Sequence, residues 1–392
     1  MEYNFDEVID RRNTDSVKWD HARDVFGRDV LPMWVADMDF KSPKPVIDAI
    51  VKHANYGVYG YTYRPGRLNE AIADWMQRRH GWKIEKDWIF YMPGVVPSIN
   101  TAVQAFTKEG DSVIIQTPVY HPFFVAVKYN GRRLLRNPLK QMDGQYLMDY
   151  EDLKDKLDMG AKMAILCSPH NPGGRVWKAE ELERFGKLCK SKDAVIVSDE
   201  IHSDIIYNGN KHIPIASISS ELSERTITCI APSKTFNIAG LSASAVIIPD
   251  ETLRRRFADT FKKTGINTGN LFGIEAMEAA YTHGEEWLEK LLVYLEGNIS
   301  FIDDYLKKNI PDLKLFRPQG TYLAWVDCRR LGLKQSMLEK FFVEKAGIGL
   351  TSGTDFGEEG EGFMRLNFGC PRSILEEGLN RIDKAVKSLQ SR

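Results

Sequence analysis

The sequence predicts an α/β protein, in which a large domain holds a mostly parallel sheet flanked by helices and a smaller α+β domain follows it. Three observations support this fold class. Helix-like segments alternate with short apolar runs from about residue 45 to 285, the runs are apolar throughout, and the last hundred residues follow a different pattern. The chain has 392 residues, which is enough for two or three domain-sized units.

Helical periodicity marks three segments in the first part of the chain. We expect helices over Lys44–Asn55, Leu68–His80 and Ser98–Lys108. Pro97 suits the first turn of the third helix, because that turn needs no proline N–H group.

Short, continuously apolar runs predict five strands. Runs of this kind are typical of strands that are covered on both faces. Their alternation with helices favours a mostly parallel sheet with helices on both sides. The predicted strands are Ser112–Gln116, Met163–Cys167, Ala194–Ser198, Thr226–Ile230 and Ala243–Ile248.

The C-terminal hundred residues predict a smaller α+β unit. Trp287–Lys308 reads as one long helix and Ser373–Gln390 as a closing helix. Gly320–Asp327 alternates like a half-exposed strand, and Phe363–Phe368 is a second strand. We therefore expect an N-terminal segment over 1–45 that packs with the small domain, a large domain over 46–285 and the small domain over 286–392.

Composition limits the classes of function. The net charge of −1 argues against nucleic acid and against anionic membranes as partners. The N-terminus is charged and has no apolar signal segment, and no run reaches the length of a membrane span. The five scattered cysteines suit a reducing compartment and read as small buried residues. We expect a cytoplasmic protein.

Three reactive side chains follow predicted strands. Asn171 comes after Met163–Cys167, Asp199 closes the next strand, and Lys234 follows Thr226–Ile230. In open α/β sheets, ligands bind beyond the carboxyl ends of the strands. A lysine there can form a Schiff base with an aldehyde cofactor, and a carboxylate can face the ring nitrogen of pyridoxal phosphate (PLP). This order of residues therefore predicts a PLP site.

Each of these residues also has a plainer interpretation. Asp199 can cap a helix, Asn171 lies in an Asn-Pro-Gly stretch typical of turns, and most lysines are solvated at the surface. If the cofactor binds, Asp199 favours the protonated ring, and the amide of Asn171 can donate to the phenolic oxygen.

Further candidates lie in similar positions. Gly94-Val95 precedes a helix, where backbone N–H groups can bind a phosphate, although a simple strand-to-helix turn explains it equally well. Tyr120 can stack on the cofactor ring or belong to the core. His202 lies three residues after Asp199 and therefore near the expected ring. No metal-binding spacing such as H-E-x-x-H is present, so we expect no metal.

Five stretches together resemble one known family. They are Arg12–Asp20 (RNTDSVKWD), Pro32–Phe40 (PMWVADMDF), Ser168–Trp177 (SPHNPGGRVW), Ser198–Asp204 (SDEIHSD) and Pro232–Leu241 (PSKTFNIAGL). They resemble the aspartate aminotransferase superfamily of PLP enzymes (fold type I), and within it the MalY/PatB-type C–S lyases, the cystathionine β-lyases. The resemblance covers nearly the whole chain and implies an aspartate aminotransferase-like fold with a seven-stranded sheet.

The resemblance implies a role for each matched residue. Lys234 would be the imine lysine and general base, Asp199 the partner of the ring nitrogen, and Asn171 a ligand of the phenolic oxygen and a neighbour of the substrate. Tyr120 would stack on the ring, with His202 beside it. The phosphate would be held by Gly94, Val95 and Ser233.

Two more implied roles reach beyond the cofactor. Tyr61 matches a tyrosine that contacts the phosphate of a neighbouring subunit, which implies a homodimer with shared active sites. Arg365, in Phe363–Asn367, matches the arginine that holds the α-carboxylate of the substrate.

The chain departs from aminotransferases at three positions. His202, Ala231 and Ser242 stand where aminotransferases commonly have tyrosine, serine and arginine. These differences favour a PLP-dependent C–S β-lyase that acts on L-cystathionine or related L-cysteine S-conjugates. The alternatives are an aminotransferase of L-amino acids and a non-catalytic regulatory protein that retains the fold. A nicotinamide dehydrogenase is disfavoured because the spaced glycines of a dinucleotide-binding fingerprint are missing.

Overall fold

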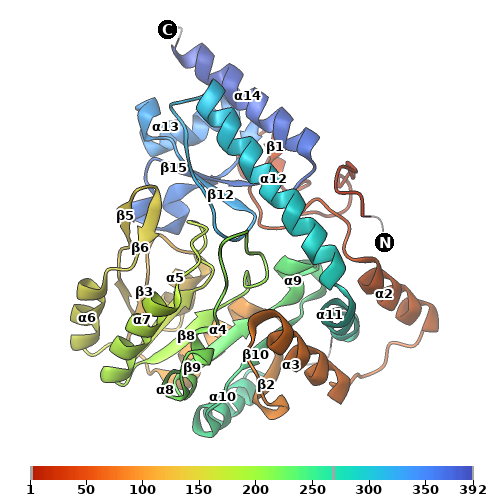
Figure 1. Cartoon of the computed structure of the whole chain (residues 1–392), viewed down its shortest axis with the longest axis vertical. Coiled ribbons are helices and arrows are strands. Elements are labelled where there is room, and N and C mark those ends of the chain that lie inside the picture. Colours follow the sequence, from red (N-terminus) through yellow and green to blue (C-terminus); the bar gives the residue numbers. More distant parts are fainter. Residues whose placement is uncertain (1–2, 267–269, 391–392) are drawn as a thin grey trace.

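A seven-stranded sheet forms the centre of the computed structural model, which describes residues 3–266 and 270–390 (Figure 1). The strand order is β2-β10-β9-β8-β7-β3-β4, and every strand runs parallel to the others except β10. This arrangement confirms the predicted α/β class. The strands are β2 (Ile89–Met92), β3 (Ser112–Ile115), β4 (Arg133–Arg136), β7 (Met163–Cys167), β8 (Val195–Asp199), β9 (Thr226–Ile230) and β10 (Ser244–Ile247).

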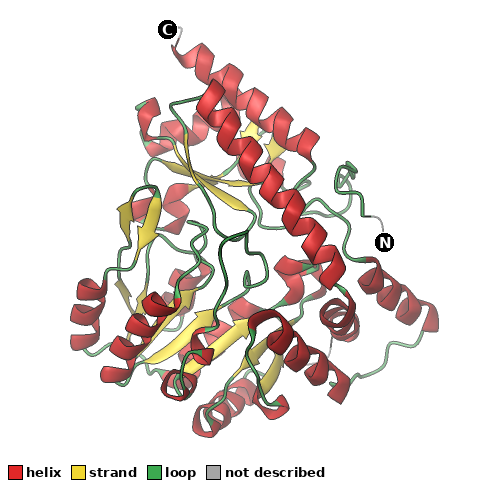
Figure 2. Ribbon diagram, in the orientation of Figure 1, coloured by secondary structure: helices red, strands yellow, loops and turns green. Residues whose placement is uncertain are grey.

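Helices cover both faces of this sheet (Figure 2). Alternate strand residues point to opposite faces, so Val113 and Ile115 pack into one apolar cluster while Ile114 packs into another. The first face is covered by α4 (Val95–Phe106), α5 (Pro122–Tyr129) and α10 (Glu251–Lys263). The second is covered by α6 (Tyr150–Asp158), α7 (Ala179–Ser191) and α8 (Ser220–Ser223).

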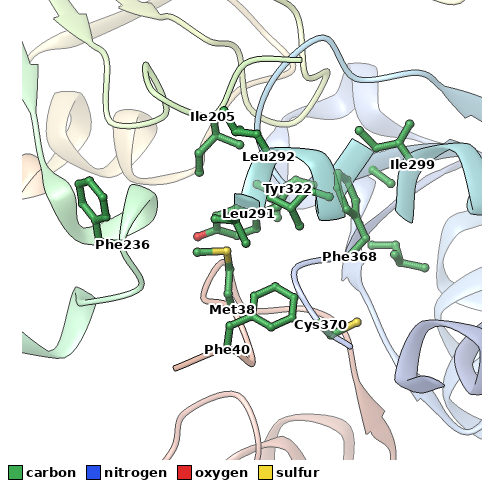
Figure 3. Packing of buried hydrophobic residues seen from close by; sticks show 14 of the residues in the cluster. Met38, Phe40, Ile205, Phe236, Leu291, Leu292, Ile299, Tyr322, Phe368 and Cys370 are labelled. Atoms are coloured by element: carbon green, nitrogen blue, oxygen red, sulfur yellow. The ribbon is translucent and has the colours of Figure 1, made fainter. Parts of the chain in front are cut away.

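A third apolar cluster joins distant parts of the chain. It contains residues of α2 (Lys44–Tyr56), α3 (Gly66–His80), α11 (Leu271–His283) and the long α12 (Glu285–Asn309). Met38, Leu291 and Tyr322 belong to it and are fully buried, or nearly so (Figure 3). This packing fixes the segment around Met38 beside the large sheet, where it contributes to the cavity described below.

A smaller antiparallel sheet has the order β11-β12-β15-β14. Its strands are β11 (Lys314–Phe316), β12 (Leu323–Asp327), β15 (Phe363–Asn367) and β14 (Thr351–Ser352), accompanied by α13 (Gln335–Lys340), the π-helical turn η5 (Phe341–Ala346) and α14 (Arg372–Gln390). Near the N-terminus, α1 (Ala22–Phe26) precedes β1 (Leu31–Pro32), which pairs with β13 (Ile348–Gly349). The domain limits at 45 and 285 stay a prediction.

The remaining elements are short. A hairpin is formed by β5 (Lys140–Met142) and β6 (Gln145–Leu147), and α9 (Pro232–Thr235) follows β9. Single 3-10 turns occur at η1 (Lys86–Trp88), η2 (Ile215–Ser217), η3 (Ala239–Leu241), η4 (Arg329–Leu331), η6 (Gly353–Phe356) and η7 (Glu358–Gly360).

Two details of the strand prediction were wrong. The segment 320–327 is not a half-exposed strand, because Leu323 and Val326 pack into one apolar cluster while Trp325 packs into another. Strands β2 and β4 were not predicted, although they form the two edges of the large sheet.

Two findings concern the predicted cytoplasmic compartment. All five cysteines are free and buried, as the sequence indicated. Among residues 3–266 and 270–390, the structure contains no helix with the length and apolar character needed to cross a membrane. A cytoplasmic location stays a prediction.

Candidate active site

The predicted site residues lie together at one end of the strands of the large sheet. The carboxyl ends of β2, β7, β8 and β9 lie at this end, and the antiparallel β10 begins there. A cavity of about 190 Å³ opens at the same end. Eight predicted residues line it, namely Gly94, Val95, Tyr120, Asn171, Asp199, His202, Ser233 and Lys234.

Lys234 projects into this cavity from the short helix α9. Pro232 occupies the start of the helix, where its missing N–H group costs nothing. The Nζ atom of Lys234 donates a hydrogen bond to the backbone oxygen of Ala36 at 2.6 Å. Burial lowers the pKa of Lys234 to about 8, although Asp37 and Asp199 act in the opposite direction. A substantial fraction of this amine is therefore neutral, and able to accept a proton, near pH 8.

Asp199 ends β8 and is 3% exposed. Its one side-chain hydrogen bond to a described residue comes from the backbone N–H of Ile201, at 3.1 Å. It therefore caps a turn rather than a helix. Burial raises the pKa of Asp199 to about 7, because this single bond and the more distant Lys234 compensate only part of the lost hydration. A cation in the cavity would satisfy this carboxylate.

Arg365 lies beside the cavity and reaches it through Asn171. Its Nη1 atom donates to Oδ1 of Asn171 at 3.1 Å, and Nη2 donates to the backbone oxygen of Trp34 at 2.9 Å and to Oγ1 of Thr351 at 3.2 Å. Within the described residues, Nε has no partner and no carboxylate forms an ion pair with the guanidinium. Burial lowers the pKa of Arg365 to about 10. This buried, unpaired cation is suited to binding a ligand carboxylate.

His202 and Tyr120 supply aromatic walls. The ring of His202 contacts that of Tyr322 edge to face at 5.9 Å, and its Nδ1 atom has no partner in the described chain. Burial lowers the pKa of His202 to about 3, with Lys234 and Arg365 acting in the same direction, so this imidazole is neutral. Tyr120 is half-buried and lines the cavity, which makes it available for stacking on a bound ring.

The other end of the cavity is suited to a phosphate. Gly94 and Val95 lie at the start of α4, where backbone N–H groups are unpaired, and Ser233 and Ser242 add hydroxyl groups. Among the described residues that line the cavity, Lys234 is the only lysine or arginine. The position where aminotransferases commonly have an arginine therefore contributes only the serine hydroxyl of Ser242.

Tyr61 does not join the site of its own chain. It is fully exposed, and it is absent from the cavity wall. The neighbouring segment exposes further apolar side chains, namely Tyr56, Val58, Tyr59 and Tyr63.

Some residues of the site had no predicted role. The backbone oxygen of Ala36 accepts hydrogen bonds from both Lys234 and the hydroxyl of Tyr322, the latter at 2.8 Å. Ala36 lies in the Pro32–Phe40 motif, which signalled the family but no function. Cys167, at the end of β7, also lines the cavity. Its position at the end of a predicted strand could have indicated that it lines the site, but a cysteine there suggested only a small buried residue.

These groups fit the PLP predicted from the sequence. The fit depends on two buried groups that lack charged partners within bonding distance in the described chain, Asp199 and Arg365. The first can face a protonated ring nitrogen, and the second can hold a substrate carboxylate. An amine with a lowered pKa and a helix start lined with hydroxyls complete the set that such a cofactor requires.

Comparison with known proteins gives a consistent result. Residues 28–382 match the family model of class I and II aminotransferases. The chain is 46% identical over 385 residues to cystathionine beta-lyase PatB of Bacillus subtilis (strain 168), covering 98% of this chain and 100% of that protein.

Two solved structures are also similar. Cystalysin from Treponema denticola, whose crystal structure contains a pyridoxal 5'-phosphate cofactor, shares 39% identity with a TM-score of 0.96, covering 99% of this chain and all of that one. The PLP-bound C–S lyase from Staphylococcus hominis shares 35% identity with a TM-score of 0.93, covering 98% of both chains.

Proposed function

Because the chain belongs to the class I and II aminotransferase family, whose members use PLP, we propose that it is a PLP-dependent C–S β-lyase. It cleaves L-cystathionine, or related L-cysteine S-conjugates, by β-elimination to a thiol, pyruvate and ammonia. The observation that carries this proposal is the cavity that joins Lys234 and Asp199 beside Arg365. The relatives named cystathionine beta-lyase and C–S lyase match the chain over almost its entire length.

Some residues of the cavity would hold the cofactor, and Lys234 would accept a proton from the substrate. Asp199 would pair with the ring nitrogen, Asn171 would donate to the phenolic oxygen, and the start of α4 with Ser233 would hold the phosphate. Bound PLP supplies an electron sink for the electron pair left at the substrate α-carbon. The Nζ atom of Lys234 accepts the α-proton, and its lowered pKa makes the neutral amine available near pH 8.

Arg365 orients the substrate for this proton transfer. The bonds to Asn171, Trp34 and Thr351 fix the guanidinium, so a bound carboxylate meets a rigid donor. The neutral His202 adds no competing charge beside it. The substrate α-carbon is thereby held toward Lys234.

A direct test follows the release of pyruvate from L-cystathionine with no keto acid added. We expect pyruvate from the wild type and a loss of at least a thousandfold in Lys234→Ala. Lys44→Ala is the control, because Lys44 is exposed and, within the part of the chain that the structure describes, pairs only with Asp48 on its own helix. Turnover that requires a keto-acid acceptor would instead identify an aminotransferase.

The exposed segment around Tyr61 supports a homodimer with shared active sites. It presents a row of apolar side chains to solvent, as surfaces that bind a partner often do. In the proposed dimer, Tyr61 contacts the phosphate held by the neighbouring chain.

Subunit hybrids test this arrangement. Tyr61→Ala and Lys234→Ala are each expected to reduce activity. If Tyr61 acts across the interface, mixing the two variants and exchanging their subunits produces one intact site in each hybrid dimer, and activity returns. If Tyr61 acts within its own chain, both sites of the hybrid stay defective and no activity returns.

A further inference from the structure

Two loops meet next to Arg365 and form what we call the rim. The backbone N–H of Val119 donates to the backbone oxygen of Phe356 at 2.8 Å, which joins loop 117–121 to loop 353–357. The guanidinium carbon of Arg365 lies 4.9 Å from the centre of the Phe356 ring. His121 and Asp355 belong to these two loops, and both lie near enough to Arg365 for its charge to act on their pKa values.

Asp355 brings a negative charge to the rim, and no cation of the described chain forms a direct ion pair with it. It is exposed, and it forms no hydrogen bond or ion pair with the rest of the described chain. It borders a second cavity, of about 450 Å³, which has no lining residue in common with the cavity at Lys234 and whose wall includes Glu339, Glu344 and one lysine, Lys340. Partial burial, and after it Glu339, raises the pKa of Asp355, and the charges of His121 and Arg365 offset only part of this rise. An added cation would relieve both effects.

The imidazole across the rim does not supply that cation. Burial of part of the ring, together with Arg365, lowers the pKa of His121 despite the opposing influence of Asp355. His121 is therefore largely neutral at pH 7 and above, and its ring contacts that of Tyr120 with the ring centres 5.5 Å apart.

We propose that Asp355 binds a distal ammonium group on the sulfur substituent of the substrate. The inference rests on the proposed lyase function and specifies its substrate class. With the α-carboxylate on Arg365, a sulfur substituent that extends to the rim meets a carboxylate that has no ion-pair partner in the described chain. Substrates with a distal ammonium, such as cystathionine, are attracted there, and substrates whose distal group is only a carboxylate are repelled.

The test compares conjugates that differ in one group. S-(2-aminoethyl)-L-cysteine and S-propyl-L-cysteine have the same length, and the first ends in an ammonium where the second ends in a methyl group. We expect the wild type to favour the aminoethyl conjugate in kcat/KM, and we expect Asp355→Asn to reduce this preference about tenfold with little change for the propyl conjugate. S-carboxymethyl-L-cysteine should become a better substrate of the variant.

Glu358→Gln is the matched control. Glu358 lies in the same region, is 85% exposed, and pairs with Arg136 rather than facing the Arg365 side of the rim. Its removal should leave the preference unchanged. Asp355→Ser serves as a second variant if Asp355→Asn does not fold.

The two hypotheses fail in different ways. If the wild type cleaves the propyl conjugate but the preference is the same in the Asp355 variants, the rim proposal is wrong and the lyase function stands. If the wild type cleaves none of the conjugates, the lyase function is wrong. In that case the dissociation constants of the aminoethyl and propyl conjugates are measured from the absorbance of the bound cofactor. If the ratio of these two constants is the same in the wild type and in the Asp355 variant, the rim proposal is wrong.

Discussion

Replacing Asp199 with asparagine should stabilise the cofactor-free protein while abolishing its activity. Burial raises the pKa of Asp199 to about 7 in the folded chain, whereas an unfolded chain has a value of about 3.9. Because folding raises this pKa, the ionised carboxylate destabilises the fold. The penalty is absent below about pH 4 and complete above about pH 7.

The magnitude follows from the difference of about three pKa units. At pH 8 the penalty is about 4 kcal/mol, and at pH 5 it is about 1–2 kcal/mol. Asparagine keeps an oxygen that can accept from the N–H of Ile201, but its buried amide N–H₂ group costs about 1 kcal/mol. The variant should therefore gain about 3 kcal/mol at pH 8 and close to nothing at pH 5.

Urea unfolding of the cofactor-free protein at both pH values measures this difference, with protein concentration held constant. Asp48→Asn is the control, because its carboxylate is 57% exposed and should show no such pH dependence. A variant at position 199 that is less stable than the wild type at pH 8, or equally stabilised at both pH values, would refute the reasoning.

Three further substitutions have distinct expected results. Phe236→Ala should lower the free energy of unfolding by about 3–5 kcal/mol in the same urea assay, because the fully buried ring packs against Trp75 and Trp287. A loss below about 1 kcal/mol would contradict this. Arg365→Lys should lower kcat/KM for L-cystathionine about a hundredfold, mainly through KM, since lysine cannot bind a carboxylate in bidentate fashion. An unchanged KM would argue against the carboxylate role. Asp39→Asn should cost about 3 kcal/mol at pH 7 in urea unfolding, because the buried Lys18 loses its partner at 2.6 Å and keeps only the more distant Asp37, at 3.8 Å. Equal stability would show that these pairs contribute little.

The central strands were predictable from the sequence and the edge strands were not. Interior strands such as β7 and β8 are buried on both faces and must be apolar throughout, which produces a clear signal. Strand β4 reads Arg-Leu-Leu-Arg, since an edge strand has one side in contact with solvent. The apolar run of β2 has only four residues, and a run of that length does not distinguish a strand from part of a buried helix. No local sequence pattern indicated that β10 runs antiparallel to its neighbours.

The site was predictable to the extent that it lies at strand ends. Asn171, Asp199 and Lys234 follow buried strands, and parallel strands bring their carboxyl ends to one edge. The contributions of Ala36 and Tyr322 depend on contacts across 198 and 286 positions of the chain, and both contacts use the backbone oxygen of Ala36, a group that every residue possesses. No pattern within a short window encodes such a contact.

Three buried aspartates show what distinguishes a functional carboxylate from a structural one. Asp39, Asp199 and Asp204 are each at most 4% exposed, so burial raises the pKa of all three. At Asp39 this effect is outweighed by Lys18, Trp19 and Arg11, and at Asp204 by His80 and Thr235, so both of these pKa values end below their ordinary range.

Asp199 alone among the three keeps the raised pKa, because the chain gives its side chain one backbone N–H group and no ion pair within the described residues. Burial by itself therefore does not mark a functional carboxylate, since all three aspartates share it. The distinguishing feature is the shortage of partners. A fold that pairs the carboxylates at positions 39 and 204 so fully yet leaves the third unsatisfied has kept that position for a cation from outside the chain, and the protonated ring of PLP is such a cation.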